Sequence, residues 1–276
     1  MSNVRKLLWV GHTRLAQDAS QIGDFQYLRV DILNSNTTQD KEAEIEFFQG
    51  FGRTGYEAFT AAGYLKLLAE YECQTTPLSG KHVIDFGCGT GAFTARIRQD
   101  GMTVTGVDIT LGCLARARKE HPGIAWVVSD IEQTGLQASC ADIVVLSGVM
   151  HHFRNLRRVI REAHRVLKVG GKVFAYDPNK RNPAMWLFRD EKSPIRSLRG
   201  ITRNERLLDP GEVRTELEAG GFRGINVYAI SGIGFKHIEG KLTQLGLPMY
   251  NVWDYLLSKV PCSRHFGSFI ITSAEK

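Results

Sequence analysis

The amino-acid sequence predicts an α/β fold built on a doubly wound, mostly parallel sheet. An apolar run at Val83–Phe86 ends in three glycines spaced two residues apart, and a helical segment follows directly. Further strand-like runs at 102–107, 124–128 and 142–146 alternate with helical patterns. Strands and helices that alternate in this way are typical of βαβ units, whose helices cover both faces of a parallel sheet.

Composition narrows the class of protein. The 276 residues suffice for one α/β domain with additions and are tight for two full domains. No run of about 18 apolar residues is present, and the N-terminus lacks the pattern of a signal peptide, so we expect a cytoplasmic location. The five cysteines include no Cys-x-x-Cys pair, and no His-Glu-x-x-His motif occurs. We therefore expect reduced cysteines and no metal site.

The glycine turn predicts a nucleotide-binding loop. It reads Asp85-Phe86-Gly87-Cys88-Gly89-Thr90-Gly91, and glycines let the backbone approach a ligand closely. The spacing alone also fits a nicotinamide dinucleotide fingerprint, because Ala92 can replace the last glycine. Asp85 favours a different ligand, since its carboxylate would repel a pyrophosphate and attract an ammonium or sulfonium group.

This loop resembles that of class I S-adenosylmethionine-dependent methyltransferases, which usually reads acidic-x-Gly-x-Gly-x-Gly. The resemblance covers about residues 80–175 and includes the turn Leu167-Lys168-Val169-Gly170-Gly171. It implies S-adenosylmethionine as the cofactor. It also implies a Rossmann-like sheet of seven strands, whose antiparallel last strand, here 267–272, lies between the fifth at 172–177 and the sixth at 225–230.

Two acids at strand ends are further candidates for cofactor binding. Asp108 lies 17 residues after Gly91, near the offset at which an acid accepts hydrogen bonds from ribose hydroxyls, although it could also cap the next helix. In the family that the loop resembles, an acid at the position of Asp130 commonly accepts from the adenine amino group. The predicted cofactor set is completed by neighbours of these acids and by the end of the next strand: Ile109, Ile131 and Ser147.

Catalytic candidates follow the buried run at 142–147. Open α/β sheets bind ligands at the carboxyl ends of their central strands, so Ser147–Phe153 should face the reacting groups. His151 or His152 could take a proton from an attacking hydroxyl, because the ordinary pKa of histidine lies near neutrality. The alternative role for these histidines is to fix the loop.

The composition of the insertion at about 178–208 indicates the chemical class of the methyl acceptor. It carries eight Lys or Arg against three acids, and the apolar run Met185–Phe188 lies among them. This combination favours a small anionic molecule with an apolar portion, such as a phosphorylated or carboxylated metabolite or a lipid-linked sugar. The alternative is a cover with solvated arginines. The candidate acceptor-binding residues are Tyr56, Tyr176, Arg181, Trp186 and Arg189.

The segments before the glycine loop are expected to form an N-terminal extension, 1–75, ahead of a cofactor-binding domain at 76–276. Helical patterns at 41–49 and 55–72 are interpreted as lid helices, because such helices often close over the ligands in this family. Tyr56 and Phe59 would then be lid residues, unless they only pack on the domain.

Two other segments are harder to classify from the sequence. Residues 7–10 and 27–30 could form short strands within the N-terminal extension. The apolar segment at about 240–260 is expected to pack on the lid.

A helix predicted at 154–168 has a basic face opposite its apolar face. The basic face could meet phosphates or an anionic membrane surface, or it could simply be solvated. We predict a methyltransferase that acts on a small acceptor, with O-methylation favoured. An RNA methyltransferase that uses this helix is one alternative, and a non-catalytic nucleotide-binding regulatory protein is another. The chain shows no recognisable RNA-binding module, which makes nucleic acid the less favoured partner.

Overall fold

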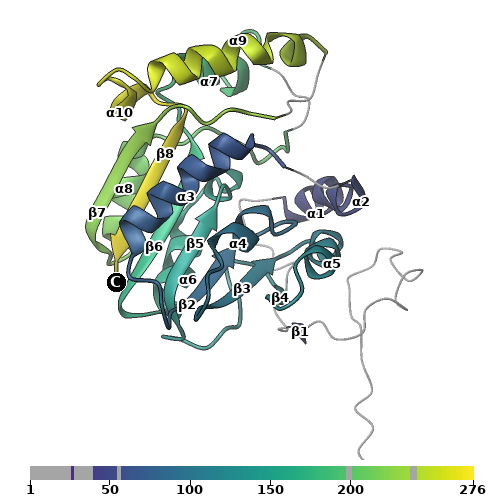
Figure 1. Ribbon diagram of the computed structural model, residues 1–276, viewed down its shortest axis with the longest axis vertical. Coiled ribbons are helices and arrows are strands. Elements are labelled where there is room, and N and C mark those ends of the chain that lie inside the picture. The colour runs from purple at the N-terminus through teal and green to yellow at the C-terminus, as the bar shows by residue number, and fades with distance from the viewer. Residues whose placement is uncertain (1–25, 28–39, 55–56, 197–200, 237–240) are drawn as a thin grey trace, which may run out of the picture.

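The computed structural model describes residues 26–27, 40–54, 57–196, 201–236 and 241–276. Its sheet has the strand order β1-β4-β3-β2-β5-β6-β8-β7 (Figure 1). The predicted seven-stranded sheet is confirmed as β2 to β8, and a two-residue strand, β1 (Gln26–Tyr27), extends its edge beside β4. The seven strands are β2 (His82–Phe86), β3 (Thr103–Asp108), β4 (Ala125–Val128), β5 (Ala141–Ser147), β6 (Leu167–Pro178), β7 (Arg223–Ile230) and β8 (Phe269–Glu275).

The last strand runs against the others, as expected. β8 pairs antiparallel with β6 on one side and with β7 on the other, with Ile271 opposite both Tyr176 and Tyr228. The remaining neighbours of β2 to β6 pair in parallel. The carboxyl ends of β2 to β6 therefore meet at one edge of the sheet, where ligands bind in open α/β folds.

Helices cover both faces of the sheet (Figure 1). Helices α3, α4 and α5 contribute buried residues to the core on one face, and α6 and α8 contribute to the core on the other. The helices are α1 (Lys41–Gln49), α2 (Phe51–Thr54), α3 (Ala61–Thr75), α4 (Ala92–Ile97), α5 (Leu111–Glu120), the 3-10 helix η2 (Met150–His152), α6 (Arg157–Val166), α7 (Pro183–Arg189), α8 (Pro210–Ala219), α9 (Lys241–Leu257) and α10 (Ser263–Phe266).

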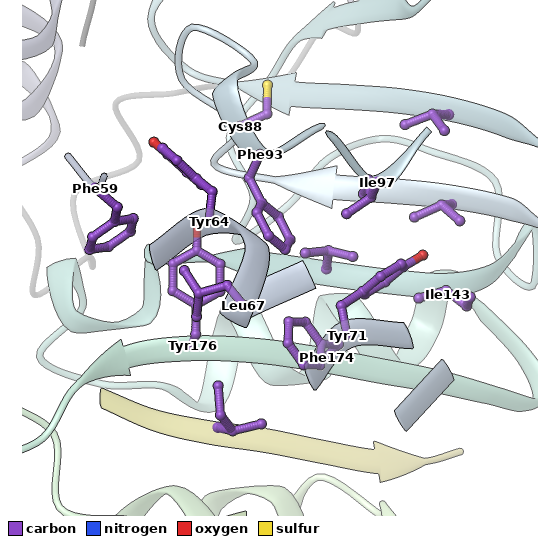
Figure 2. Close-up of a cluster of buried hydrophobic side chains, with 14 of the residues drawn as sticks. Phe59, Tyr64, Leu67, Tyr71, Cys88, Phe93, Ile97, Ile143, Phe174 and Tyr176 are labelled. Atoms are coloured by element: carbon purple, nitrogen blue, oxygen red, sulfur yellow. The ribbon is translucent and has the colours of Figure 1, made fainter. Parts of the chain in front are cut away.

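The core under α3 is aromatic, as Figure 2 shows. The ring of Tyr71 on α3 lies 5.4 Å from that of Phe174 on β6, and the ring of Phe93 on α4 lies 6.5 Å from Phe174. Successive residues of β6 alternate between the two cores, with Phe174 on one face and Val173 on the other. Tyr71 and Leu67 are fully buried, so α3 is a core helix rather than part of a lid.

Several predicted boundaries need correction. The helix predicted at 55–72 begins at Ala61, because Thr60 caps it by accepting a hydrogen bond from the N–H of Gly63 at 3.1 Å. Phe59 is extended instead and bridges to Phe235. The helix predicted at 154–168 ends at Val166, since Leu167 already pairs with β5. The predicted strand at 7–10 lies outside the described residues.

Two expectations from composition can be compared with the structure. All five cysteines are free thiols, as expected. Within the described part of the chain, no helix combines the length and apolar character that crossing a membrane requires.

Gly91 lets the glycine loop pack on β4. Its φ of +80° is left-handed, and a Cβ there would lie 2.6 Å from Cη2 of Trp126. Gly80 has a similar φ of +74°, but a Cβ there would have no neighbour within 4 Å. The two glycines therefore separate the cost of backbone conformation from the cost of a clash.

We predict that Gly91→Ala lowers the free energy of unfolding by about 2–5 kcal/mol, since left-handed strain of about 1–2 kcal/mol adds to overpacking of about 1–3 kcal/mol. Gly80→Ala should lose only the strain. Urea denaturation of both variants measures the difference. Equal losses would show that Trp126 yields to the added methyl group.

Candidate active site

The glycine loop is tied to the end of the neighbouring strand. The N–H groups of Gly87 and Cys88 donate to the carbonyl of Val107 at 2.8 and 3.1 Å. Gly87 has a φ of +70°, and a Cβ there would lie 2.3 Å from Cγ2 of Val149. A side chain at Gly87 would thus collide with the loop after β5, so the glycine allows the two loops to meet.

Asp108 joins this loop to the start of α5. Its Oδ2 accepts the N–H of Gly89 at 2.8 Å, and its Oδ1 accepts the N–H of Thr110 at 2.7 Å. Burial raises the pKa of Asp108, and these hydrogen bonds oppose that rise. A carboxylate oxygen has two lone pairs, so both oxygens keep acceptor capacity for a ligand.

A cavity of about 230 Å³ lies at the carboxyl edge of the sheet. The glycine loop, the ends of β3 and β4 and the loop after β5 form one wall, and α1 and α2 form another. The predicted cofactor residues that line it are Gly87, Cys88, Gly89, Asp108, Ile109, Asp130, Ile131 and Ser147.

The predicted ligand contact of Asp85 needs correction. Its carboxylate is fully buried behind the loop and does not line the cavity. It accepts hydrogen bonds from the hydroxyls of Thr94 at 2.6 Å and Ser147 at 2.7 Å, and burial raises its pKa to about 7. Asp85 therefore holds α4 and the end of β5 against the loop. Gly91 does not line the cavity either, because it packs on Trp126.

Asp130 has a partner that the sequence did not reveal. The buried ammonium group of Lys41, on α1, forms ion pairs with Asp130 and with Glu132, the latter at 2.8 Å. The other carboxylate oxygen of Asp130 accepts the N–H of Glu132 at 2.9 Å. Helix α1 is thus held over the part of the cavity predicted to receive adenine.

His151 is held as a neutral imidazole. Oδ1 of Asp177 accepts both its backbone N–H at 3.0 Å and its Nδ1–H at 2.9 Å. Burial lowers the pKa of His151 to about 3 and raises that of Asp177 to about 8. A proton on Asp177 would occupy Oδ2, so Oδ1 accepts in either state. Nε2 of His151 is then the unprotonated nitrogen.

His152 is shifted the opposite way, toward the charged imidazolium. Its Nδ1 lies 3.1 Å from Oε2 of Glu44, on α1. Burial opposes the charged imidazole, but the hydrogen bond to Glu44 and nearby carboxylates outweigh it and raise the pKa of His152. Burial likewise opposes ionisation of Glu44, whose pKa His152 nevertheless lowers. The ring of Phe48 lies 5.4 Å from that of His152 and helps to enclose this ion pair.

The predicted acceptor residues divide into two groups. Tyr176 and Arg189 line the cavity, but Arg189 donates to Glu205 at 3.0 Å. Arg181 and Trp186 do not line it: Arg181 pairs with Asp209 at the surface, and Trp186 is on the outer side of α7. Tyr56 lies outside the described residues.

One cluster has the composition of a metal site. Ligand atoms of His151, His152 and Glu205 lie within 4.8 Å of one another. Each residue already has a partner, since Asp177, Glu44 and Arg189 hold them respectively. The expectation of a metal-free site stays a prediction.

The basic face of α6 and its flanks is largely neutralised. Arg154 pairs with Glu191, Arg165 pairs with Glu162, and further ion pairs join Arg157 to Glu216 and Lys168 to Asp142. A surface that binds phosphates uses Lys and Arg to neutralise them, and four of the six cations of this face already have carboxylate partners. This helix therefore gives little support to the RNA alternative.

Comparisons with known proteins identify the domain. The family described as "Methyltransferase domain" matches residues 84–175. A malonyl-[acyl-carrier protein] O-methyltransferase of Pectobacterium atrosepticum is 37% identical over 95 residues, which are 34% of this chain and 38% of that protein. A ubiquinone biosynthesis O-methyltransferase of Coxiella burnetii is 25% identical over 207 residues, which are 70% of this chain and 88% of that protein.

A solved structure supports the fold. Phosphoethanolamine N-methyltransferase 2 of Haemonchus contortus, in complex with S-adenosyl-L-methionine, has a TM-score of 0.61 at 16% identity, covering 84% of this chain and 56% of that chain. Such identity shows the fold alone. The aligned region is 38% of the length of the malonyl-[acyl-carrier protein] O-methyltransferase, so this similarity is limited to one part of each protein.

The His152–Glu44 ion pair predicts a pH-dependent stability. Because the pKa of His152 is raised in the folded protein, His152 contributes fully to the free energy of unfolding below its ordinary pKa of 6.5. This contribution is lost as pH rises through the pKa of the folded state. Because the pKa of Glu44 is lowered in the folded protein, Glu44 contributes fully to the free energy of unfolding above its ordinary pKa of 4.5. This contribution is lost as pH falls through the pKa of the folded state. The pair stabilises most between these two values.

We predict that Glu44→Gln lowers the free energy of unfolding by about 1.5–3 kcal/mol near pH 6, because a charge-assisted hydrogen bond is lost. The loss should shrink as pH rises through the raised pKa of His152, because the imidazole then loses its charge in the folded state as well. Urea titrations at several pH values measure it, with Glu42→Gln, on the exposed side of α1, as the control. A loss that does not vary with pH would contradict the ion pair.

Proposed function

We propose that the chain, whose residues 84–175 match a methyltransferase domain, transfers a methyl group from S-adenosylmethionine to a hydroxyl of a small acceptor. One observation carries the proposal. The glycine loop with Asp108 lines the same cavity as His151, whose Nδ1 is held by Asp177. A nucleotide-binding loop and a neutral base thus open onto one space.

The residues at the loop fit the cofactor. Gly89 has no neighbour within 4 Å of the position of a Cβ, so the backbone there leaves room for a ligand. Both oxygens of Asp108 keep lone pairs for ribose hydroxyls, and Asp130 with Ile131 would hold the adenine ring. S-adenosylmethionine supplies an electrophilic methyl group on its sulfonium, so the protein must mainly orient the acceptor.

His151 is the candidate for the role of general base, because its position and tautomer leave Nε2 free to accept a proton. Asp177 orients its ring, and the unprotonated Nε2 can take the proton of an acceptor hydroxyl as the new bond forms. The adjacent cation His152 keeps the pKa of His151 low, after burial itself. This arrangement favours O-methylation, which is also the reaction in the names of the two relatives.

The acceptor wall is mainly aromatic. Phe59 lies 6.1 Å from Tyr176 and 5.2 Å from Phe269 between ring centroids, and all three line the cavity. This wall suits an acceptor with an apolar or aromatic body. Arg189 is the remaining candidate for an anionic substituent, and such a group would share it with Glu205.

Cofactor binding gives the first test. We predict that Asp108→Ala lowers the affinity for S-adenosylmethionine and S-adenosylhomocysteine by at least about tenfold, because hydrogen bonds to a charged acceptor are lost. Isothermal titration calorimetry measures it, with the exposed Asp100→Ala as the control. Binding of NAD instead of the sulfur ligands by the folded wild-type protein would refute the proposed cofactor.

The base gives the second test. We predict that His151→Ala lowers kcat by about 10²–10⁴-fold with little change in the affinity for the cofactor. Because the pKa of His151 lies at about 3, its protonation should cost no activity between neutral and mildly acidic pH. Transfer of a labelled methyl group to a panel of phenols and hydroxy acids, with and without EDTA, measures the rate.

A matched control variant helps to distinguish a catalytic role of His151 from a purely structural one. His164→Gln changes a histidine on α6 that packs on Phe222 and does not line the cavity, so its rate should equal that of the wild type. Unchanged kcat in His151→Ala would show that this residue only fixes the loop. Loss of wild-type activity in EDTA would instead assign a metal to the His151, His152 and Glu205 cluster.

A further inference from the structure

Helix α9 turns an apolar face to solvent. Leu245, Met249, Val252 and Leu256 are spaced by four, three and four residues, so they form one row along the helix. They are 80%, 76%, 60% and 59% exposed, respectively. Between residues 244 and 257, no exposed position of α9 carries a charge. A water-facing helix normally shows the opposite pattern.

The inner face of α9 is fastened by polar groups. Oδ2 of Asp254, the only acid of the helix, accepts the N–H groups of Gly232 and Ile233 at 2.7 and 2.9 Å. The side chain of Asn251 exchanges two hydrogen bonds with the backbone of Phe235, at 3.0 and 2.9 Å. These specific bonds fix the rotation of α9 about its axis. The outward apolar row is therefore a built feature of the fold.

Helix α7 extends this apolar surface. Its Trp186, Leu187 and Phe188 are 38%, 37% and 43% exposed. Figure 1 shows α7 and α9 at the same end of the molecule. The positive charge of Arg189, at the end of α7, is close enough to Tyr250 of α9 to oppose the rise in the pKa of that tyrosine. We call the exposed apolar side chains of α7 and α9 the apolar end face. Large exposed apolar patches mark binding sites in soluble proteins.

The apolar end face borders the cavity. Met185, next to Trp186, lines the cavity from α7. Tyr250 of α9 packs with a ring-centroid distance of 5.9 Å against Phe235, which also lines the cavity. One layer of side chains thus separates the exterior apolar surface from the aromatic acceptor wall.

The residues around the apolar end face indicate what covers it. Trp253 and Tyr255 are partly exposed on α9, and the first charged side chain after the helix is that of Lys259, an exposed cation. Lys259 lies 4.8 Å from the ring centroid of Tyr255. Apolar rows flanked by Trp, Tyr and basic residues are typical of helices that lie in a membrane interface.

We propose that the apolar end face docks on a lipid bilayer that contains anionic lipids. The row from Leu245 to Leu256 enters the acyl region, and Lys259 meets the headgroups. The contact differs from the basic face of α6, whose cations are largely paired.

Flotation of the full chain with vesicles tests the docking. The vesicles are phosphatidylcholine with or without phosphatidylglycerol, and the variant combines Met249→Glu with Val252→Glu. We expect the wild type to float with the anionic vesicles and the variant to bind at least about tenfold more weakly, because two charges enter the apolar row. The control combines Leu65→Glu with Val169→Glu, which are 67% and 89% exposed on α3 and β6. It should float like the wild type.

The outcomes separate this proposal from others. Equal flotation of wild type and α9 variant, or no flotation of the wild type, overturns it. A wild-type dimer that the α9 variant converts to monomer, without vesicle binding, assigns the apolar end face to a second copy of the chain and also overturns it. Binding of S-adenosylhomocysteine by the α9 variant shows that it is folded. Failure of the wild type to bind that ligand would refute the proposed function and leave the flotation result standing.

Discussion

The carboxylate of Asp108 is the constraint on which the site depends. It accepts N–H groups from Gly89, in the loop after β2, and from Thr110, at the start of α5. Both loops are therefore fixed at one point, next to the strand pair in which Phe86 lies opposite Val107. Burying a carboxylate is costly unless hydrogen bonds compensate it, so the loops and the charge stabilise each other.

The two adjacent histidines show how packing decides chemistry. Both are enclosed, yet Asp177 orients a neutral His151 while Glu44 retains the charge of His152. The partners come from α1, which precedes η2 in the chain, and from β6, which follows it. Environments that push two neighbouring pKa values apart are typical of acid–base sites.

The features that could be predicted from the sequence are local motifs and residues at the carboxyl ends of parallel strands. The glycine loop, Asp108 and Asp130 follow strand ends, and parallel strands bring all carboxyl ends to one edge of the sheet, so their meeting could be foreseen. The ion pair of Lys41 with Asp130 spans 89 residues and has no local signature.

The same limit applies to the insertion. Its excess of positive charge favoured an anionic acceptor, but Arg181 and Arg206 are paired with Asp209 and Glu212, which lie just beyond it. Charge counted within a segment cannot show which acids fold against it.

Helix α1 links the two halves of the site. Lys41 and Glu44 are three residues apart, so they lie on one face of the helix and reach Asp130 and His152 together. A ligand group that displaces Lys41 from Asp130 would weaken the docking that also holds Glu44 on His152. Coupling of this kind is reciprocal. The position of α1 would thus couple the charge of His152 to the binding of a ligand at Asp130.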